Sequence, residues 1–169
     1  MEIKFGIITV SDRSSRGERL DTSGPLLADA IKTRGWLVSN ALIIPDEFDQ
    51  IKNTLITWSD SSQLDVILTT GGTGFASRDV TPEATLAIVD KVAPGIPEAM
   101  REESLKITPH AMLSRMAAGI RKRTLIINLP GSPKAALENF EVVCPVLEHA
   151  VQLLREDPDS EQGHLATKH

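Results

Sequence analysis

The chain has 169 residues, of which 41% are hydrophobic and 24% are charged, an ordinary composition for a single globular domain. Its formal net charge is −5, and it contains four Phe, two Trp and no Tyr, so it lacks the basic face and the stacking side chains that nucleic-acid binding needs. No apolar run reaches the roughly 18 to 20 residues that cross a bilayer, and the single cysteine, Cys144, suits a reducing compartment, so we expect a cytoplasmic protein that binds neither nucleic acid nor membrane.

Apolar runs rich in β-branched residues alternate along the chain with segments of helical period. The apolar runs predict strands buried on both faces at residues 3–10, 37–44, 64–70 and 124–129. The periodic segments predict helices from Ser23 toward Gly35, from Glu47 to about Ser59, from Thr81, and from Ser132 toward Arg155. This alternation predicts an α/β fold, a three-layer α/β/α sandwich with a mostly parallel sheet.

Two parts of the chain do not follow this alternation. Residues 90–119 are the hardest to place, and we expect them to be mostly helical with breaks at Pro94-Gly95, Pro97 and Pro109. Beyond Glu156 the chain is polar and has no hydrophobic period. We therefore expect a single domain over residues 1–156 and a disordered tail over residues 157–169.

The glycine-rich loop Gly71-Gly72-Thr73-Gly74 directly follows a predicted buried strand. Its backbone N–H groups can approach an anion without hindrance from Cβ atoms, although a tight turn that needs only positive φ is the alternative. The chain has no Gly-Lys-Ser/Thr tripeptide, so a P-loop does not fit. A dinucleotide fingerprint should follow the first strand, and these glycines follow the third, so that motif does not fit either.

Three other loops should join the glycine loop, since ligands of open parallel sheets bind beyond the carboxyl ends of the strands. They are residues 11–17, 45–47 and 130–133. In the last of them, Pro130-Gly131-Ser132 precedes a helix, where Ser132 is either an ordinary N-cap or part of an anion site at the helix N-terminus.

The aspartates Asp46 and Asp79 flank the glycine loop from neighbouring strand ends. Each alone is explained by a solvated loop, and Asp79 also by a cap on the helix that begins at Thr81. Together they suit Mg²⁺ held against phosphates.

These motifs resemble the signature of the molybdopterin adenylyltransferases of the MogA/MoaB type, a family that includes the G domains of gephyrin and of its plant counterpart. The resemblance rests on ordered runs that match over about residues 3–155. They are Pro45-Asp46-Glu47, Thr69-Thr70-Gly71-Gly72-Thr73-Gly74, Arg78-Asp79-Val80-Thr81-Pro82-Glu83-Ala84-Thr85, Ala111-Met112-Leu113-Ser114-Arg115 and Asn128-Leu129-Pro130-Gly131-Ser132-Pro133.

The resemblance implies a three-layer, MogA-like fold that forms a homotrimer. It also implies an enzyme of molybdenum cofactor biosynthesis that transfers AMP from ATP to molybdopterin with Mg²⁺, releases pyrophosphate and passes its product to a molybdenum-inserting enzyme. Two other functions stay open: a non-catalytic molybdopterin-binding module of the MoaB type, and a nicotinamide-dependent oxidoreductase, which the position of the glycines disfavours.

The family's site residues carry over to two groups of positions. Asp46 and Asp79 correspond to the catalytic aspartates, to which we assign Mg²⁺. The glycine loop and the Pro-Gly-x-Pro loop also correspond, so nucleotide phosphates are expected on Gly71, Gly72, Thr73, Gly74, Pro130, Gly131 and Ser132. To these we add Ser114, Arg115 and Arg78, which we expect to hold an anionic part of the pterin or the pyrophosphate, although a solvated arginine before a helix is the alternative for Arg78.

The composition of the tail gives a first prediction. Because residues beyond Glu156 lack the period of a packed element, deletion of Pro158–His169 should leave the melting temperature and the activity nearly unchanged. A calorimetric scan that shows a loss of several degrees, on the order of 1 kcal/mol or more, would show that the tail docks on the domain.

Overall fold

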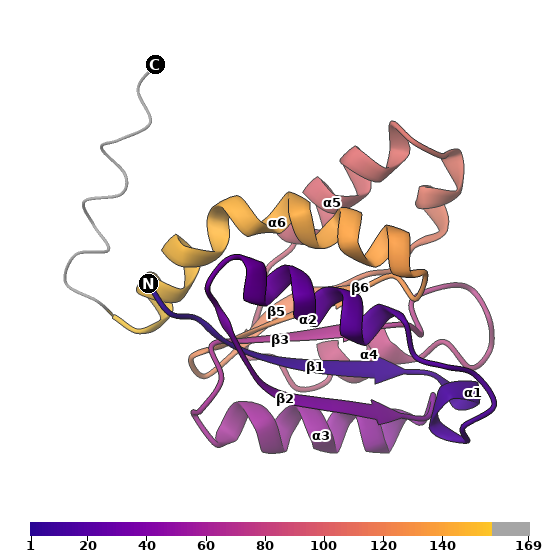
Figure 1. Cartoon of the computed structure of the whole chain (residues 1–169), viewed down its shortest axis with the longest axis horizontal. Coiled ribbons are helices and arrows are strands. Elements are labelled where there is room, and N and C mark those ends of the chain that lie inside the picture. Colours follow the sequence, from indigo (N-terminus) through magenta and orange to yellow (C-terminus); the bar gives the residue numbers. More distant parts are fainter. Residues whose placement is uncertain (157–169) are drawn as a thin grey trace.

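The computed structural model describes residues 1–156, so the tail expected over residues 157–169 lies outside the described residues. Strands and helices alternate along the chain as expected (Figure 1). In order they are β1 (Lys4–Val10), α1 (Asp12–Ser15), α2 (Ser23–Thr33), β2 (Leu37–Ile44), α3 (Phe48–Asp60), β3 (Val66–Thr70), α4 (Thr81–Leu86), β4 (Lys91–Val92), α5 (Gly95–Leu105), the 3-10 helix η1 (Pro109–Leu113), β5 (Ala118–Arg121), β6 (Thr124–Leu129) and α6 (Pro133–Leu154).

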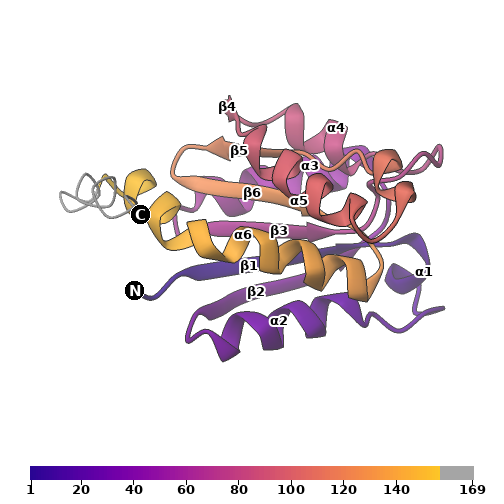
Figure 2. The same cartoon turned by 90° about the horizontal axis from the view of Figure 1, so that it is seen from above.

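The strands form one six-stranded sheet in the order β2-β1-β3-β6-β5-β4. Strands β2, β1, β3 and β6 are parallel, and β5 runs antiparallel to both of its neighbours. Helices α2, α5 and α6 cover one face of the sheet, and α3 and α4 cover the other (Figures 1 and 2). The predicted three-layer α/β/α fold with a mostly parallel sheet is confirmed.

A hydrophobic core lies on each face of the sheet. On the side of α2 and α6, Phe5 stacks on Trp36 with ring centroids 5.5 Å apart and meets the edge of Phe140 at 6.1 Å. On the other side, Ile51 and Leu55 of α3 are fully buried against the sheet. These two cores fix the sheet between its helices and so fix where the strand ends meet.

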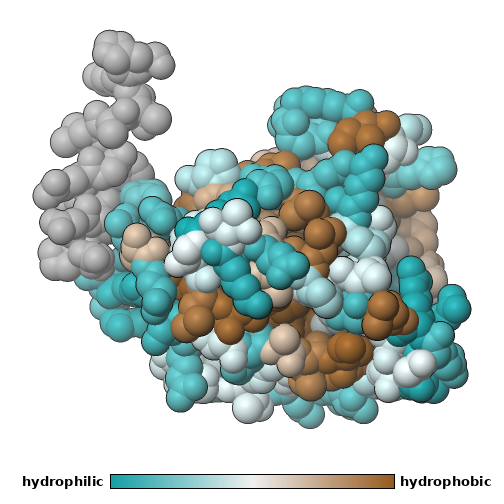
Figure 3. Space-filling view, in the orientation of Figure 1, coloured by the Kyte–Doolittle hydropathy of each residue, from teal (hydrophilic) through white to brown (hydrophobic). Residues whose placement is uncertain are grey.

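The prediction that residues 37–44 are buried on both faces is wrong. Strand β2 is the edge of the sheet and only Ile44 is buried, while Leu37, Leu42 and Ile43 are 41–44% exposed. An edge strand with a neighbour on one side only has less cover than a central one. Apolar side chains accordingly reach the surface of the face drawn in Figure 3.

The prediction that residues 90–119 are mostly helical holds for α5 and η1 but misses two strands. Strand β4 and the first half of β5 lie in this region and extend the sheet by antiparallel pairing. Strands of two and four residues, one of them containing Gly119, carry no apolar run long enough to be recognised. Among the described residues, no helix has the length and apolar character to cross a membrane.

Candidate functional site

The four loops expected to meet do so at the carboxyl edge of the parallel strands, near α1 in Figure 1. Together they form a cavity of about 410 Å³, which we call the rim cavity. Both predicted aspartates, part of the glycine loop and part of the Pro130–Ser132 segment lie in its wall. The full lining is Thr9, Val10, Ser11, Ser14, Arg19, Leu20, Asp21, Thr22, Ser23, Asp46, Thr70, Gly71, Gly72, Asp79, Gly131 and Ser132.

A second cavity, of about 300 Å³, lies on the other side of the same two loops, and we call it the apolar cavity. It takes Thr73 and Gly74 from the glycine loop and Pro130 from the last loop, so both cavities share one wall. Ser114 also lines it, and the Oγ of Ser114 is buried without a hydrogen-bond partner. An unpaired buried hydroxyl costs stability, so a polar ligand atom in this cavity would gain a partner there.

The glycine loop passes between the two aspartates at distances that exclude side chains. Gly72 has φ +67°, and a Cβ atom on it would lie 2.3 Å from the Oγ1 of Thr81 and 3.0 Å from Oδ1 of Asp46. A Cβ atom on Gly74 would lie 2.9 Å from Oδ2 of Asp79. The glycines are therefore needed both for the turn and for a close approach to the carboxylates; anion binding by their N–H groups stays a prediction.

Asp46 is held by Asp12 through a reciprocal pair of hydrogen bonds. The N–H of Asp12 donates to Oδ2 of Asp46 (2.8 Å), and the N–H of Asp46 donates to Oδ1 of Asp12 (3.0 Å). Burial raises the pKa of Asp46, and the charges of Asp12 and Asp79 raise it further, against the bond from Asp12. A bound cation would favour the ionised carboxylate, so the electrostatics of the site fit a metal at this position.

Asp79 does not cap the following helix, so that alternative is wrong. Helix α4 begins after Val80 and has no side-chain cap. Oδ2 of Asp79 instead accepts a hydrogen bond from the N–H of Ala76 (2.9 Å) and closes the turn before the helix. The side chain of Asp79 therefore orders this turn and also lines the rim cavity.

A metal site here would depend on two carboxylates. Within residues 1–156, no group of three or more His, Cys, Asp or Glu side chains could hold a metal ion. Mg²⁺ commonly takes one or two carboxylates and completes its shell with water and substrate phosphates, which the Asp46–Asp79 pair can accommodate. The predicted metal ligands are thus brought together, and metal binding stays a prediction.

The two predicted ligand-binding arginines do not line either cavity. Arg78 pairs with the carboxylate of Asp12 through two bonds of 2.9 Å and with Glu47 at 2.8 Å. The guanidinium of Arg115 pairs with Glu83 and donates to the carbonyl oxygens of Gly74 and Asp79, at 2.7 Å each. Both arginines are engaged by the protein, and their contact with ligand stays a prediction.

The loop that leads into α6 caps the helix and lines the rim cavity, and anion binding there stays a prediction. Oγ of Ser132 accepts from the N–H of Ala135, so Ser132 is the N-cap, and it also lines the rim cavity. The hydroxyl of Thr70 donates to the carbonyl oxygen of Pro130 (2.7 Å), and the hydroxyl of Ser23 donates to the carbonyl oxygen of Gly131 (2.9 Å). The N-terminus of a 22-residue helix is thereby held at the cavity.

Asp12 and Asp21 belong to this site, although the sequence analysis did not single them out. Asp12 follows the end of β1 just as Asp46 follows the end of β2, and that equivalence was the available signal. Asp21 accepts from the hydroxyl of Thr9 (2.8 Å) and from the N–H of Gly24 (3.0 Å). An aspartate shortly before a helix is typical of capping, and only the fold brings Asp21 into the rim cavity.

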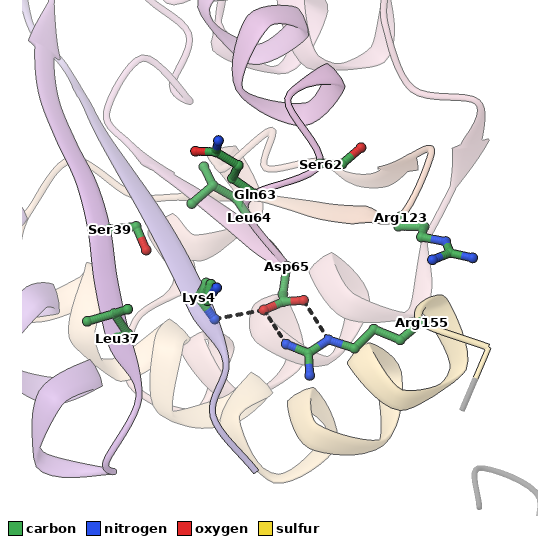
Figure 4. A pocket seen from close by; sticks show the side chains of 9 residues that line it. All are labelled: Lys4, Leu37, Ser39, Ser62, Gln63, Leu64, Asp65, Arg123 and Arg155. Atoms are coloured by element: carbon green, nitrogen blue, oxygen red, sulfur yellow. Dashed lines mark hydrogen bonds and ion pairs between the residues drawn. The ribbon is translucent and has the colours of Figure 1, made fainter. Parts of the chain in front are cut away.

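A larger cavity, of about 760 Å³, lies at the opposite, amino end of the strands (Figure 4). Its central carboxylate, Asp65, accepts from the N–H of Lys4 (2.8 Å) and from two nitrogens of Arg155 (2.8 and 2.7 Å). None of the predicted site residues lies there.

Comparison with known proteins places the chain in a family. A family model described as "probable molybdopterin binding domain" matches residues 6–149. The chain is 44% identical over 154 residues to a molybdopterin adenylyltransferase of Helicobacter pylori, covering 90% of this chain and 88% of that protein. It is 46% identical over 159 residues to the Drosophila melanogaster molybdenum cofactor synthesis protein cinnamon, covering 92% of this chain but only 26% of that protein. The structure of the molybdopterin biosynthesis enzyme MoaB from Thermus thermophilus has a TM-score of 0.86 and 49% identity, with coverage of 92% and 98%.

The raised pKa of Asp46 gives a second prediction. The Asp46 carboxyl binds its proton more tightly in the folded state than in the unfolded state, where its ordinary pKa is 3.8. Its contribution to the free energy of unfolding is therefore largest below that pH and falls as the pH rises through the folded-state pKa. Asp46→Asn keeps the acceptor for the N–H of Asp12 and removes this loss. At pH 7 the melting temperature of this variant should therefore lie above that of the wild type.

The control for this measurement is the pH series itself. The advantage of Asp46→Asn over the wild type should shrink as the pH is lowered toward about 4 in scans without added metal. If Asp46→Asn melts at or below the wild-type temperature at pH 7, the raised pKa of Asp46 is contradicted.

Proposed function

The chain belongs to the family of probable molybdopterin-binding domains, and from that premise we propose that it is a molybdopterin adenylyltransferase of molybdenum cofactor biosynthesis. It would transfer AMP from ATP to molybdopterin and release pyrophosphate. The observation that carries this proposal is the single rim cavity that both aspartates, the glycine loop and the Pro130–Ser132 segment share. Its support from relatives is the 44% identity along most of an adenylyltransferase of similar length.

We assign the nucleotide to the rim cavity and the pterin to the apolar cavity. The N–H groups of Gly72–Gly74 would bind nucleotide phosphates at the wall between the two cavities, and the N-terminus of α6 would face the same anion. Ser114 would bind the pterin or its phosphate from the apolar cavity, where its buried hydroxyl lacks a partner. This arrangement would bring the terminal phosphate of molybdopterin and the α-phosphate of ATP to one wall.

The transfer exchanges one phosphorus–oxygen bond for another. A terminal phosphate oxygen of molybdopterin attacks the α-phosphorus of ATP, the bond to the β-phosphate oxygen breaks, and pyrophosphate leaves with its electron pair. The attacking phosphate is already ionised at neutral pH, so we assign no general base. The main difficulty is to bring two anions together, which positioning and charge compensation overcome.

Asp46 and Asp79 would hold Mg²⁺, which when bound supplies positive charge to the phosphates. The chain's own groups would orient the two substrates: the glycine-loop amides fix the nucleotide phosphates, and the Pro130–Ser132 backbone lines the nucleotide pocket. The downstream partner would be a molybdenum-inserting enzyme. The cytoplasmic location expected from the single cysteine stays a prediction.

A direct assay separates this function from its alternatives. The protein incubated with ATP, Mg²⁺ and molybdopterin should release pyrophosphate in proportion to the adenylylated pterin formed. A non-catalytic module would bind molybdopterin without releasing pyrophosphate. An oxidoreductase would instead change the absorbance of a nicotinamide cofactor. The first result supports the proposal, and either of the other two overturns it.

The third prediction concerns Asp79. Asp79→Asn keeps an acceptor for the N–H of Ala76 but removes the charge that would anchor Mg²⁺. Adenylyl transfer should fall at least about a hundredfold, equivalent to roughly 2.7 kcal/mol of transition-state stabilisation. Molybdopterin binding and the melting temperature should change little, and added Mg²⁺ should partly restore the rate.

Asp65→Asn is a matched control, since it removes an aspartate charge at the opposite end of the strands. It should lower stability, because Asp65 pairs with Arg155, while the rate per folded molecule stays normal. Normal turnover of Asp79→Asn at limiting Mg²⁺ would sink the metal assignment.

The fourth prediction concerns assembly. We propose a homotrimer in which the 90–119 region contributes to the interface, and this region exposes Val92, Ile107 and Met112 at 59–66%. Exposed apolar side chains lose contact with water on association, which favours an interface in this region. Light scattering at micromolar concentration should give about three times the 18.4 kDa chain mass. A clean monomer mass would contradict this assembly.

A further inference from the structure

We propose that Arg115 is a positioning residue. It fixes the glycine loop relative to the turn that contains Asp79, and it does not itself bind the ligand. Its bearing on catalysis rests on the proposed function; its bearing on loop order does not. Two of its donors point to the glycine loop. The N–H of Arg115 donates to the carbonyl of Thr73 (2.9 Å), and Nε donates to the carbonyl of Gly74 (2.7 Å).

The rest of the guanidinium reaches the next loop and the next helix. Nη2 donates to the carbonyl oxygen of Asp79 (2.7 Å), and Nη1 pairs with the carboxylate of Glu83 in α4. One residue thus joins both halves of the segment that carries the glycines and Asp79. Since the planar fork fixes the directions of its donors, the carbonyls of Gly74 and Asp79 are held in one relative position.

Arg115 is itself anchored from the helix behind it. Arg101 of α5 donates from Nε to the carbonyl of Ser114 (3.1 Å) and from Nη2 to that of Met116 (3.3 Å), the two carbonyls that flank Arg115. The two arginines therefore form a chain of contacts from α5 to the glycine loop. The backbone of Arg115 is thus anchored by Arg101 and its guanidinium by the glycine loop and α4, and we call this fixed connection the strut.

Protein acceptors take three of the five N–H groups of the Arg115 guanidinium. Each nitrogen of the guanidinium already has a protein partner, and its side chain is 33% exposed yet lines neither cavity. Ser114, the neighbouring residue, lines the apolar cavity and has an unpaired hydroxyl. We therefore assign ligand contact to Ser114 and support of the loops to its neighbour Arg115.

The strut matters because the loop is rich in glycine. Glycine loses more conformational freedom on ordering than other residues, so a loop with three glycines in four positions does not hold its shape alone. The N–H groups and Asp79 must be in place before the substrates arrive if they are to act without reorganisation. Arg115 supplies that order from outside the cavity.

The fifth prediction tests the strut without substrates. Hydrogen exchange of the Ala76, Asp79 and Thr81 amides reports the loop, since these amides donate within it or to Gly72. Arg115→Met should speed their exchange at least about tenfold. Arg115→Lys, with one donor group in place of a fork, should lie between Arg115→Met and the wild type.

The matched control is Arg121→Met. Arg121 also makes three bonds, to Asp60 and to the carbonyl of Ile88, and its side chain is 21% exposed, but it lies away from both cavities. This variant should lose stability without faster exchange at the three amides and without a lower kcat. Glu83→Gln weakens only the outer support of Arg115, so it should raise exchange and lower kcat less than Arg115→Met does.

Kinetics separate positioning from ligand contact. Positioning predicts that kcat of Arg115→Met falls at least about thirtyfold and that more Mg²⁺ is needed for half-maximal rate, in step with faster exchange. A higher KM for ATP or molybdopterin with unchanged kcat and unchanged exchange would overturn the inference. If the wild type releases no pyrophosphate while Arg115→Met still loosens the loop, the strut stands and the proposed function fails.

Discussion

Three carboxylates, from Asp12, Asp46 and Asp79, come together where the parallel strands end, and their like charges constrain a site in which Asp46 is also partly buried. Arg78 compensates Asp12 and lowers its pKa, chiefly by a hydrogen bond between the side chains. Asp79 is paired with a backbone N–H, and Asp46 is left half-buried with a raised pKa. The uncompensated charge therefore lies between Asp46 and Asp79, where a cation gains most.

The same constraint applies to Arg78 and Arg115, which lie outside the rim cavity, whereas Arg19 lines it. ATP and a phosphate ester are anions, and an acidic cavity repels them unless positive groups offset its charge. Arg78 and Arg115 are both paired with carboxylates of the protein, which reduces the charge that they offer to an anionic substrate. Compensation is then expected from a bound cation, the glycine-loop amides and the N-terminus of α6.

The hydrophobic pattern of the sequence was enough to predict the central strands and that the loops after them lie together. The parallel strands, their helices and the loops that carry Asp46, the glycines and Pro130 follow from hydrophobic period and from the rule for strand ends. The exposure of β2 and the pairing of β4 and β5 depend on sheet order, which no local window contains. The partners of Arg115 are likewise set by tertiary contacts between residues 32 to 41 positions apart.

The antiparallel pairing of β5 with β6 brings the segment before β5 next to the buried Asn128 of β6. Its Nδ2 donates to the hydroxyls of Thr69 in β3 and Thr85 in α4 (2.9 Å each), and its Oδ1 accepts from the N–H of Ala117 (3.3 Å).

Asn128 therefore ties together the strand before the glycine loop, the helix after Asp79 and the segment that carries Arg115. An apolar residue of similar size would fill the same space but leave these buried donors and acceptors unpaired, which costs more than packing returns. A buried amide with all these partners accepts one arrangement of the surrounding elements. In the proposed role of Arg115, the contacts of Asn128 fix the segment next to Arg115 relative to β3 and α4.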